Sequence, residues 1–189
     1  MVKCNYFEKL GQLATLAESA VQLTCGNIPH RDPQDVSNLR KASDRLICEM
    51  EDALFSDFLP PLERENLAAC AHCLSRVMDQ ASELFSYLSI LPAGAQVNEE
   101  GRICILLASG LRNAIAMLPR IRKPDEIPDV RGFRQLLCRG RDAHATMLSK
   151  LHSGVLPRSA AQVIIHTGRL RCELSHAFDE LVEIMLNNI

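Results

Sequence analysis

The sequence contains no tryptophan, and aromatic residues make up only 4% of its 189 residues. β-Branched residues rarely alternate with polar ones, so the pattern of a half-buried strand is also missing. Hydrophobic residues account for 47% and charged residues for 23%, which excludes disordered and collagen-like chains. The chain is long enough to bury a core, and we expect residues 1–189 to form a single domain.

The sequence also has neither a strong positive charge nor a long apolar run. Its net charge is −2 and its pI is about 6.3, so the chain lacks the excess positive charge that is typical of nucleic-acid-binding proteins. The most apolar stretch, residues 103–111, is far shorter than the roughly 20 residues that cross a bilayer, and the first residues do not resemble a signal peptide. We therefore expect a cytoplasmic protein that binds no nucleic acid and is peripheral to a membrane at most.

Apolar residues recur with the helical period along most of the chain. Pro and Gly residues divide it into six segments, which predict helices over about residues 6–20, 36–53, 67–88, 98–121, 130–152 and 159–187. Asp32 or Asp35 is expected to open the second helix, and Pro61 fits the first turn of the third. The fourth helix is apolar on most of its circumference, which predicts a central position. The breakers Pro29, Pro124 and residues 91–94 fall between the segments.

The two halves of the chain resemble each other. Asp44 and Asp142 occupy corresponding second helices 98 residues apart, and Pro60 and Pro157 lie 97 residues apart. Short connections favour antiparallel neighbours. The predicted fold is therefore all-α, with six antiparallel helices arranged as two repeated three-helix bundles, in halves of about 1–92 and 93–189.

One junction carries a family resemblance. Residues 58–67, Phe-Leu-Pro-Pro-Leu-Glu-Arg-Glu-Asn-Leu, are similar to the Phe-x-x-Pro-x-x-Arg-Glu-Asp junction of the divergent PhoU-like family of phosphate transport regulators. Residues 5–10, Asp44, residues 123–127 and residues 171–173 support the resemblance. In physical terms, Glu63 and Glu65 favour the positive end of the third helix, and Arg64 is expected to pair with Asp57.

The resemblance implies acidic motifs on the helices that bind clusters of iron, zinc or similar metals. In this sequence the motifs are eroded, because most of the expected acidic positions hold other residues: Arg40, Ala42, Ser75, Arg76, Cys138, Gly140, His166 and Leu170. Asp44, Asp79 and Asp142 remain. A single carboxylate per motif cannot hold a multinuclear cluster, so we expect no cofactor beyond residual Zn or Fe.

His72, Ser75 and Asp79 lie on one stripe of the third helix and could form a mononuclear site with Asp44 or Asp142. The simpler interpretation is a polar stripe. Cys70 and Cys73 form a C-x-x-C pair, but it lacks the second pair of a zinc ribbon and the strand of a thioredoxin-like motif. Cysteines packed as small hydrophobic residues are the usual case, and the eight cysteines are expected to be reduced thiols.

The remaining polar residues favour ordinary surface roles. Arg40 is expected to form an i, i+4 pair with Asp44, and the other arginines near the motifs (Arg76, Arg139, Arg141, Arg169 and Arg171) to lie on a solvated face. The four C-terminal histidines, His144, His152, His166 and His176, are expected to be surface or capped imidazoles. Gly110 and Gly168 lie within helices, which suggests close helix approach.

The sequence thus predicts a non-enzymatic regulator that acts by protein contact, because it contains no P-loop, nucleophile elbow or dinucleotide fingerprint. The resemblance implies a Pit-type phosphate permease as the partner, with Arg64 and Glu65 as candidate contact residues. An alternative is a metal or redox sensor that uses Cys70, His72, Cys73 and Asp79. A third is a scaffold that forms a homo-oligomer.

Overall fold

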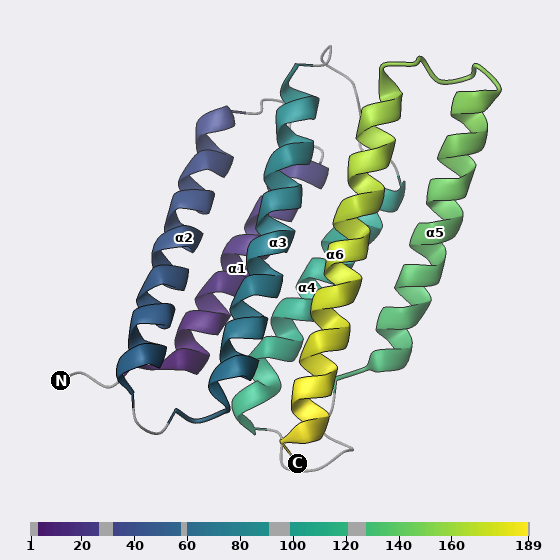
Figure 1. Cartoon of the computed structure of the whole chain (residues 1–189). Helices are drawn as coiled ribbons and strands as arrows, with labels where there is room; N and C mark the ends of the chain where they lie inside the picture. The colour runs from purple at the N-terminus through teal and green to yellow at the C-terminus, as the bar shows by residue number, and fades with distance from the viewer. Residues whose placement is uncertain (1–3, 27–31, 58–59, 91–98, 121–127, 189) are drawn as a thin grey trace.

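The computed structural model describes residues 4–26, 32–57, 60–90, 99–120 and 128–188. These residues form six α-helices and one short 3-10 helix, and they contain no strand. The elements are α1 (Tyr6–Cys25), α2 (Pro33–Ser56), α3 (Arg64–Ser89), α4 (Glu99–Met117), η1 (Leu118–Arg120), α5 (Val130–His152) and α6 (Ala160–Asn187), and they run up and down in alternation (Figure 1). The all-α prediction is confirmed.

Side-chain caps explain three of the helix starts. The side chains of Asn5, Asp32 and Asp129 accept hydrogen bonds from backbone N–H groups in the first turns of α1, α2 and α5. Helix α3 begins only at Arg64, so the expectation that Pro61 lies in its first turn is wrong. Both prolines instead belong to the connection that precedes the helix. Pro29, Phe58, Leu59, Pro124 and residues 91–94 and 123–127 lie outside the described residues.

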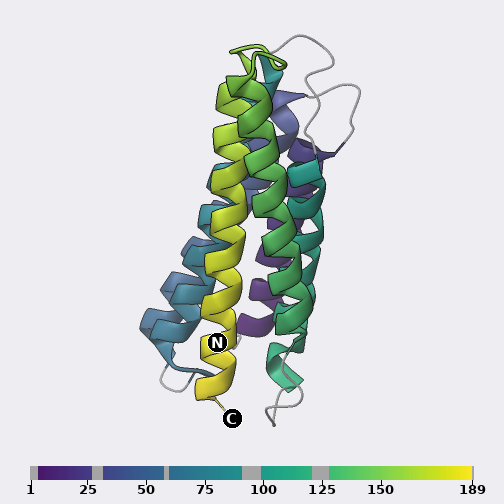
Figure 2. The same cartoon turned by 90° about the vertical axis from the view of Figure 1, so that its right-hand side faces the viewer.

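Four helices form the centre of the bundle. Helices α1, α3, α4 and α6 pack on one another, while α2 packs on α1 and α3 at one side and α5 on α4 and α6 at the other (Figures 1 and 2). The halves α1–α3 and α4–α6 therefore repeat the same three-helix arrangement and meet along α1–α4 and α3–α6. Only three residues of α5 and five of α2 are buried, against twelve of α6 and eleven of α3.

Helix α4 is central, as its apolar circumference predicts. Together with η1 it is the one described helix long and apolar enough to cross a membrane, judged by length and composition. Half of its most apolar window is buried within the bundle. Its composition is therefore explained by packing, because Ile103, Leu107 and Leu111 belong to the core shared by all six helices.

Candidate functional site

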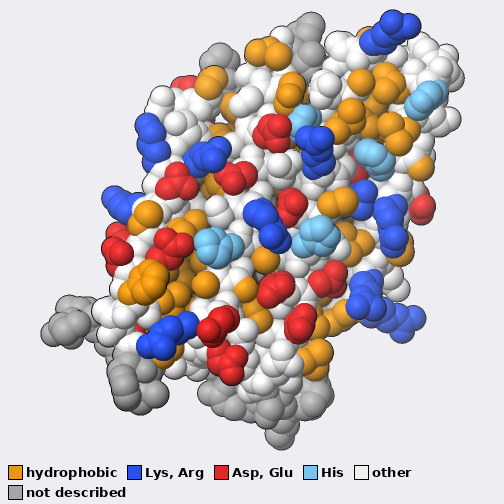
Figure 3. Space-filling model, in the orientation of Figure 1, with side chains coloured by type: hydrophobic (Ala, Val, Ile, Leu, Met, Phe, Trp, Pro, Cys, Tyr) orange, Lys and Arg blue, Asp and Glu red, His pale blue; other side chains and the backbone are white. Residues whose placement is uncertain are grey.

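The face formed by α2, α3 and α6 carries most of the residues that the sequence singles out. Acidic, basic and histidine side chains alternate over it (Figure 3). Ion pairs join neighbouring helices there: Arg40 of α2 lies 2.8 Å from Asp79 of α3, and Arg76 of α3 lies 3.0 Å from Glu173 of α6. These side chains are mostly half exposed, so each pair contributes only tenths of a kcal/mol, about 0.2 to 1.

The predicted Arg40–Asp44 pair is wrong. Arg40 turns across to Asp79 because α3 packs against α2 and places that carboxylate within hydrogen-bond distance. Asp44 is exposed and, like Asp142, has no ion-pair partner in the described parts of the chain. Each surviving acidic position of the eroded motifs is therefore either paired with an arginine or isolated.

The residues proposed for a mononuclear metal site do not converge. His72 faces Glu51, 3.7 Å away, and Asp79 faces Arg40. Asp142 lies on α5, on the opposite side of the bundle from α2 (Figure 1). Within the described residues no group of three His, Cys, Asp or Glu side chains could hold a metal ion. The donor groups that the structure describes therefore do not fit a metal cluster.

Cys70 and Cys73 belong to the hydrophobic core. Both are buried, and burial raises the pKa of Cys70 to about 12 and that of Cys73 above its usual value. A thiol with so high a pKa stays protonated near neutral pH and is a poor nucleophile and metal ligand. His72 is exposed and turned toward α2, so the four residues of the sensor hypothesis are not brought together.

The junction before α3 is organised by Arg64. Its Nε donates to the carbonyl of Leu54 at 2.9 Å and its Nη2 to the carbonyl of Asp57, so Arg64 satisfies the C-terminal end of α2. Arg64 thus pairs with Asp57 as expected, but through the backbone carbonyl; the Asp57 carboxylate accepts from the Tyr6 hydroxyl at 2.7 Å. Glu65 is exposed.

A buried glutamate that sequence reasoning missed lies where α4, α5 and α6 meet. Glu100 of α4 is fully buried; its Oε1 accepts from Arg171 Nε at 2.9 Å, and its Oε2 lies 2.8 Å from His144 Nδ1. A buried carboxylate is tolerated only when it is paired and hydrogen-bonded, and these two side chains meet that requirement. We call these three residues the Glu100 cluster.

Two glycines on facing helices make the Glu100 cluster fit. A Cβ at Gly140 of α5 would lie 2.6 Å from Arg171 Cδ, and a Cβ at Gly168 of α6 would lie 2.7 Å from His144 Cε1. Gly140 thus leaves room on α5 for the Arg171 side chain of α6, and Gly168 leaves room on α6 for the His144 side chain of α5. The expected close approach at Gly168 is confirmed, and so is that at Gly110, where a Cβ would lie 3.3 Å from Phe133.

His166 is buried rather than at the surface, which corrects the prediction for this residue. Its ring stacks on Tyr87 with a centroid distance of 4.3 Å, and its Nδ1 lies 3.6 Å from Glu83 without a hydrogen bond. Burial lowers the pKa of His166, Glu83 partly opposes this shift, and Arg169 adds to it. The sequence predicts exposure for this polar residue because the partner that covers it, Tyr87, lies on another helix.

Two hollows in the surface of the described residues are considered as sites, and the first of them lies beside the Glu100 cluster. The first, which we call the α6 hollow, has a volume of about 530 Å³ and is lined by Gln80, His144, Ile165, Gly168, Arg169, Arg171, Cys172 and Glu173.

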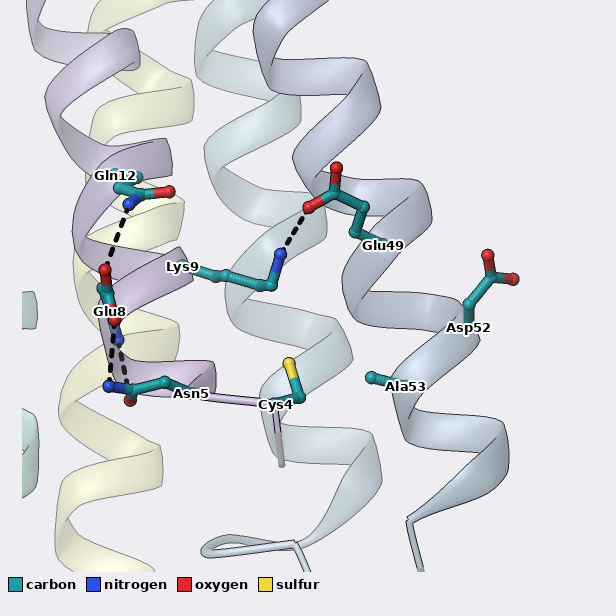
Figure 4. Close-up of a pocket in the computed structure, with 8 residues that line it drawn as sticks. All are labelled: Cys4, Asn5, Glu8, Lys9, Gln12, Glu49, Asp52 and Ala53. Atoms are coloured by element: carbon teal, nitrogen blue, oxygen red, sulfur yellow. Dashed lines mark hydrogen bonds and ion pairs between the residues drawn. The ribbon is translucent and has the colours of Figure 1, made fainter. Parts of the chain in front are cut away.

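The second hollow lies between α1 and α2 (Figure 4). There Lys9 pairs with Glu49 at 2.5 Å and lowers its pKa, while Asp52 points away from the pair. The second hollow therefore contains an internal ion pair and no set of converging groups.

The fold and its outer face define a class: an all-helical bundle of two repeated halves with a charge-paired surface. The crystal structure of a PhoU-like phosphate regulatory protein from Shewanella oneidensis MR-1 has this fold, with a TM-score of 0.66, 17% identity and 96% of each chain covered. A second PhoU-like protein from the same organism gives 0.63, 18% and 96% of each chain. No family model and no curated protein matches the sequence. The predicted PhoU-like resemblance is thus confirmed for the fold.

Proposed function

We propose that the protein is a non-enzymatic, cytoplasmic regulator of inorganic phosphate transport that acts by contact with a Pit-type phosphate permease. The observation that carries the proposal is the fold, which matches a PhoU-like phosphate regulatory protein over 96% of both chains. The described residues offer a broad charged face and no assembled catalytic group, which suits a protein that acts by binding.

The replacement of acidic residues by arginine supports a mode of action without a metal cluster. Arg40 and Arg76 place guanidinium groups against Asp79 and Glu173 on the face where the family resemblance implies metal ligands. An arginine supplies within the chain the positive charge that a bound cation would otherwise supply. The face therefore remains close to neutral and available for a protein partner.

Phosphate uptake in cells tests the proposal. Deletion of the gene is expected to change the rate of phosphate uptake, and the tagged protein is expected to capture a phosphate permease from native membranes. Wild-type uptake in the deletion strain, or capture of no permease, would contradict it.

Glu65 allows the contact itself to be tested, because it is exposed at the junction that carries the resemblance. Glu65→Lys should reduce permease capture without changing the fold. Asp35→Lys, which reverses an exposed charge near the opposite end of the bundle, is the matched control and should leave capture intact (Figure 1). Arg64 is unsuitable for this purpose because it closes the end of α2.

A further inference from the structure

We propose that the α6 hollow binds inorganic phosphate. Three groups, Arg169, Arg171 and His144, line it together and offer nitrogen atoms that suit a small tetrahedral oxyanion. The inference goes beyond the regulatory role and does not depend on it, since binding is a property of the isolated chain.

Arg171 is fixed before any ligand arrives. Its side chain is only 12% exposed, and its Nε is held by Glu100, which orients the guanidinium plane. Among the described residues its one hydrogen bond is the bond from Nε, and Arg171 also lines the hollow, so its terminal nitrogens remain available to a ligand there. A guanidinium already held in place loses little conformational freedom when it binds an oxyanion, which favours affinity.

His144 is expected to make the site selective for inorganic phosphate over other anions. Nδ1 of His144 lies 2.8 Å from the Glu100 carboxylate, and in the tautomer that donates from Nδ1 the other ring nitrogen, Nε2, is an acceptor. Inorganic phosphate near neutral pH retains an O–H group that can donate to Nε2. Sulfate has no such hydrogen, and a phosphomonoester loses it above a pKa of about 6.

The charge around the hollow favours an anion. Three guanidiniums, those of Arg76, Arg169 and Arg171, face two carboxylates: Glu100 beneath the hollow and Glu173 in its wall. Arg76 pairs with Glu173 and Arg171 with Glu100, whereas Arg169 is exposed and has no carboxylate partner in the described chain. It supplies the surplus positive charge.

The neighbouring helix extends this positive field. Helix α5 has five basic residues and one acidic residue, whereas its counterpart α2 has three basic and five acidic. Lys and Arg side chains accordingly gather over α5 on the right-hand side of Figure 3. A field of one sign raises the local concentration of the opposite ion.

Titration of the purified full-length chain at constant ionic strength tests the proposal. Inorganic phosphate should bind saturably, followed by calorimetry and by the ring resonances of His144, and should bind more tightly than sulfate or glycerol phosphate. Arg169→Gln should weaken phosphate binding about tenfold, since it removes a charge-assisted contact from an exposed side chain without disturbing the core.

Arg131→Gln is the matched control. It removes an exposed cation from the same basic helix, roughly 20 Å along the axis from His144, and should leave phosphate affinity unchanged within about twofold. Binding that does not saturate, equal loss in both variants, or equal affinity for sulfate and phosphate would overturn the proposal. Because no permease is present, failure here leaves the transport role standing, and failure of the uptake test leaves the binding site standing.

Discussion

Gly140 and Gly168 are the smallest residues of the Glu100 cluster's surroundings and the ones that determine its geometry. Both lie in helix interiors, where glycine is otherwise unfavourable by roughly 0.5–1 kcal/mol relative to alanine. At these two positions, however, Arg171 and His144 occupy the space that a methyl group would fill. The role of these two glycines is to leave space for the side chains that contact Glu100, and not to allow a turn.

Substitution of these glycines should therefore be unfavourable. Gly140→Ala and Gly168→Ala are each expected to lower the free energy of unfolding by about 1–3 kcal/mol, because the new methyl group displaces Arg171 or His144 from Glu100. Urea unfolding measures the change. Gly11→Ala is the control: nothing lies within 4 Å of its Cβ position in α1, and the change should stabilise by up to about 1 kcal/mol. Equal stability of all three variants would contradict the packing described.

His166 should make stability depend on pH. Burial lowers its pKa, so the folded protein takes up a proton less readily than the unfolded chain. The stabilisation is therefore complete above the unfolded-state value of about 6.5 and is lost progressively as the pH falls below it. His166→Phe, which keeps an aromatic ring against Tyr87, should be less sensitive to acid than the wild type when unfolding is compared at about pH 7.5 and about pH 5. His176→Gln, at an exposed position, should retain the wild-type slope.

At the scale of the helices, the boundaries were largely predictable. Asp32 before Pro33 and the proline breakers are local signals, and local signals specify helix ends. Pairing between helices was not predictable in the same way. Arg40 could be assigned to Asp44 from spacing alone, whereas its actual partner, Asp79, is 39 residues away and becomes a neighbour only when α2 packs on α3.

The Arg40–Asp79 contact suggests how a metal site could be introduced on the α2–α3 surface. Arg40→Glu would place a carboxylate four residues before Asp44 and opposite Asp79, and carboxylates spaced in this way can share an ion. We expect this variant to bind zinc or iron more tightly than the wild type, as measured by elemental analysis after dialysis. Arg40→Gln, which removes the guanidinium but adds no carboxylate, should show no such gain. Stoichiometric metal in the wild-type protein would contradict the interpretation.

At the scale of the whole molecule, the two halves share one core. Ion pairing reinforces the seam between them, since Arg112 of α4 lies 2.5 Å from Glu18 of α1. The repeat was visible in the sequence as the spacing of Asp44 from Asp142 and of Pro60 from Pro157. The Glu100 cluster was not, because Glu100, His144 and Arg171 come from three helices and have no counterpart motif to mark them.

A shared core predicts that the halves unfold together. We expect a single cooperative transition in urea, with Cys25, Cys70, Cys73 and Cys104 becoming reactive toward a thiol reagent only within it. The exposed Cys48, Cys138 and Cys172 should react in the native state and serve as the internal reference. Release of Cys70 and Cys73 at a lower urea concentration than Cys104 would show that α1–α3 unfolds separately.

The seam along α1–α4 and α3–α6 also affects how the protein is made. Helices α1–α3 leave the ribosome first, and α1 and α3 then lack the partners that α4 and α6 provide in the folded protein. Translation of the last hundred or so residues takes roughly 5–20 s, which is long compared with hydrophobic collapse. During this time the nascent first half exposes a hydrophobic surface. A chaperone that shields emerging helices should therefore affect the yield of folded protein more than the stability of the folded protein.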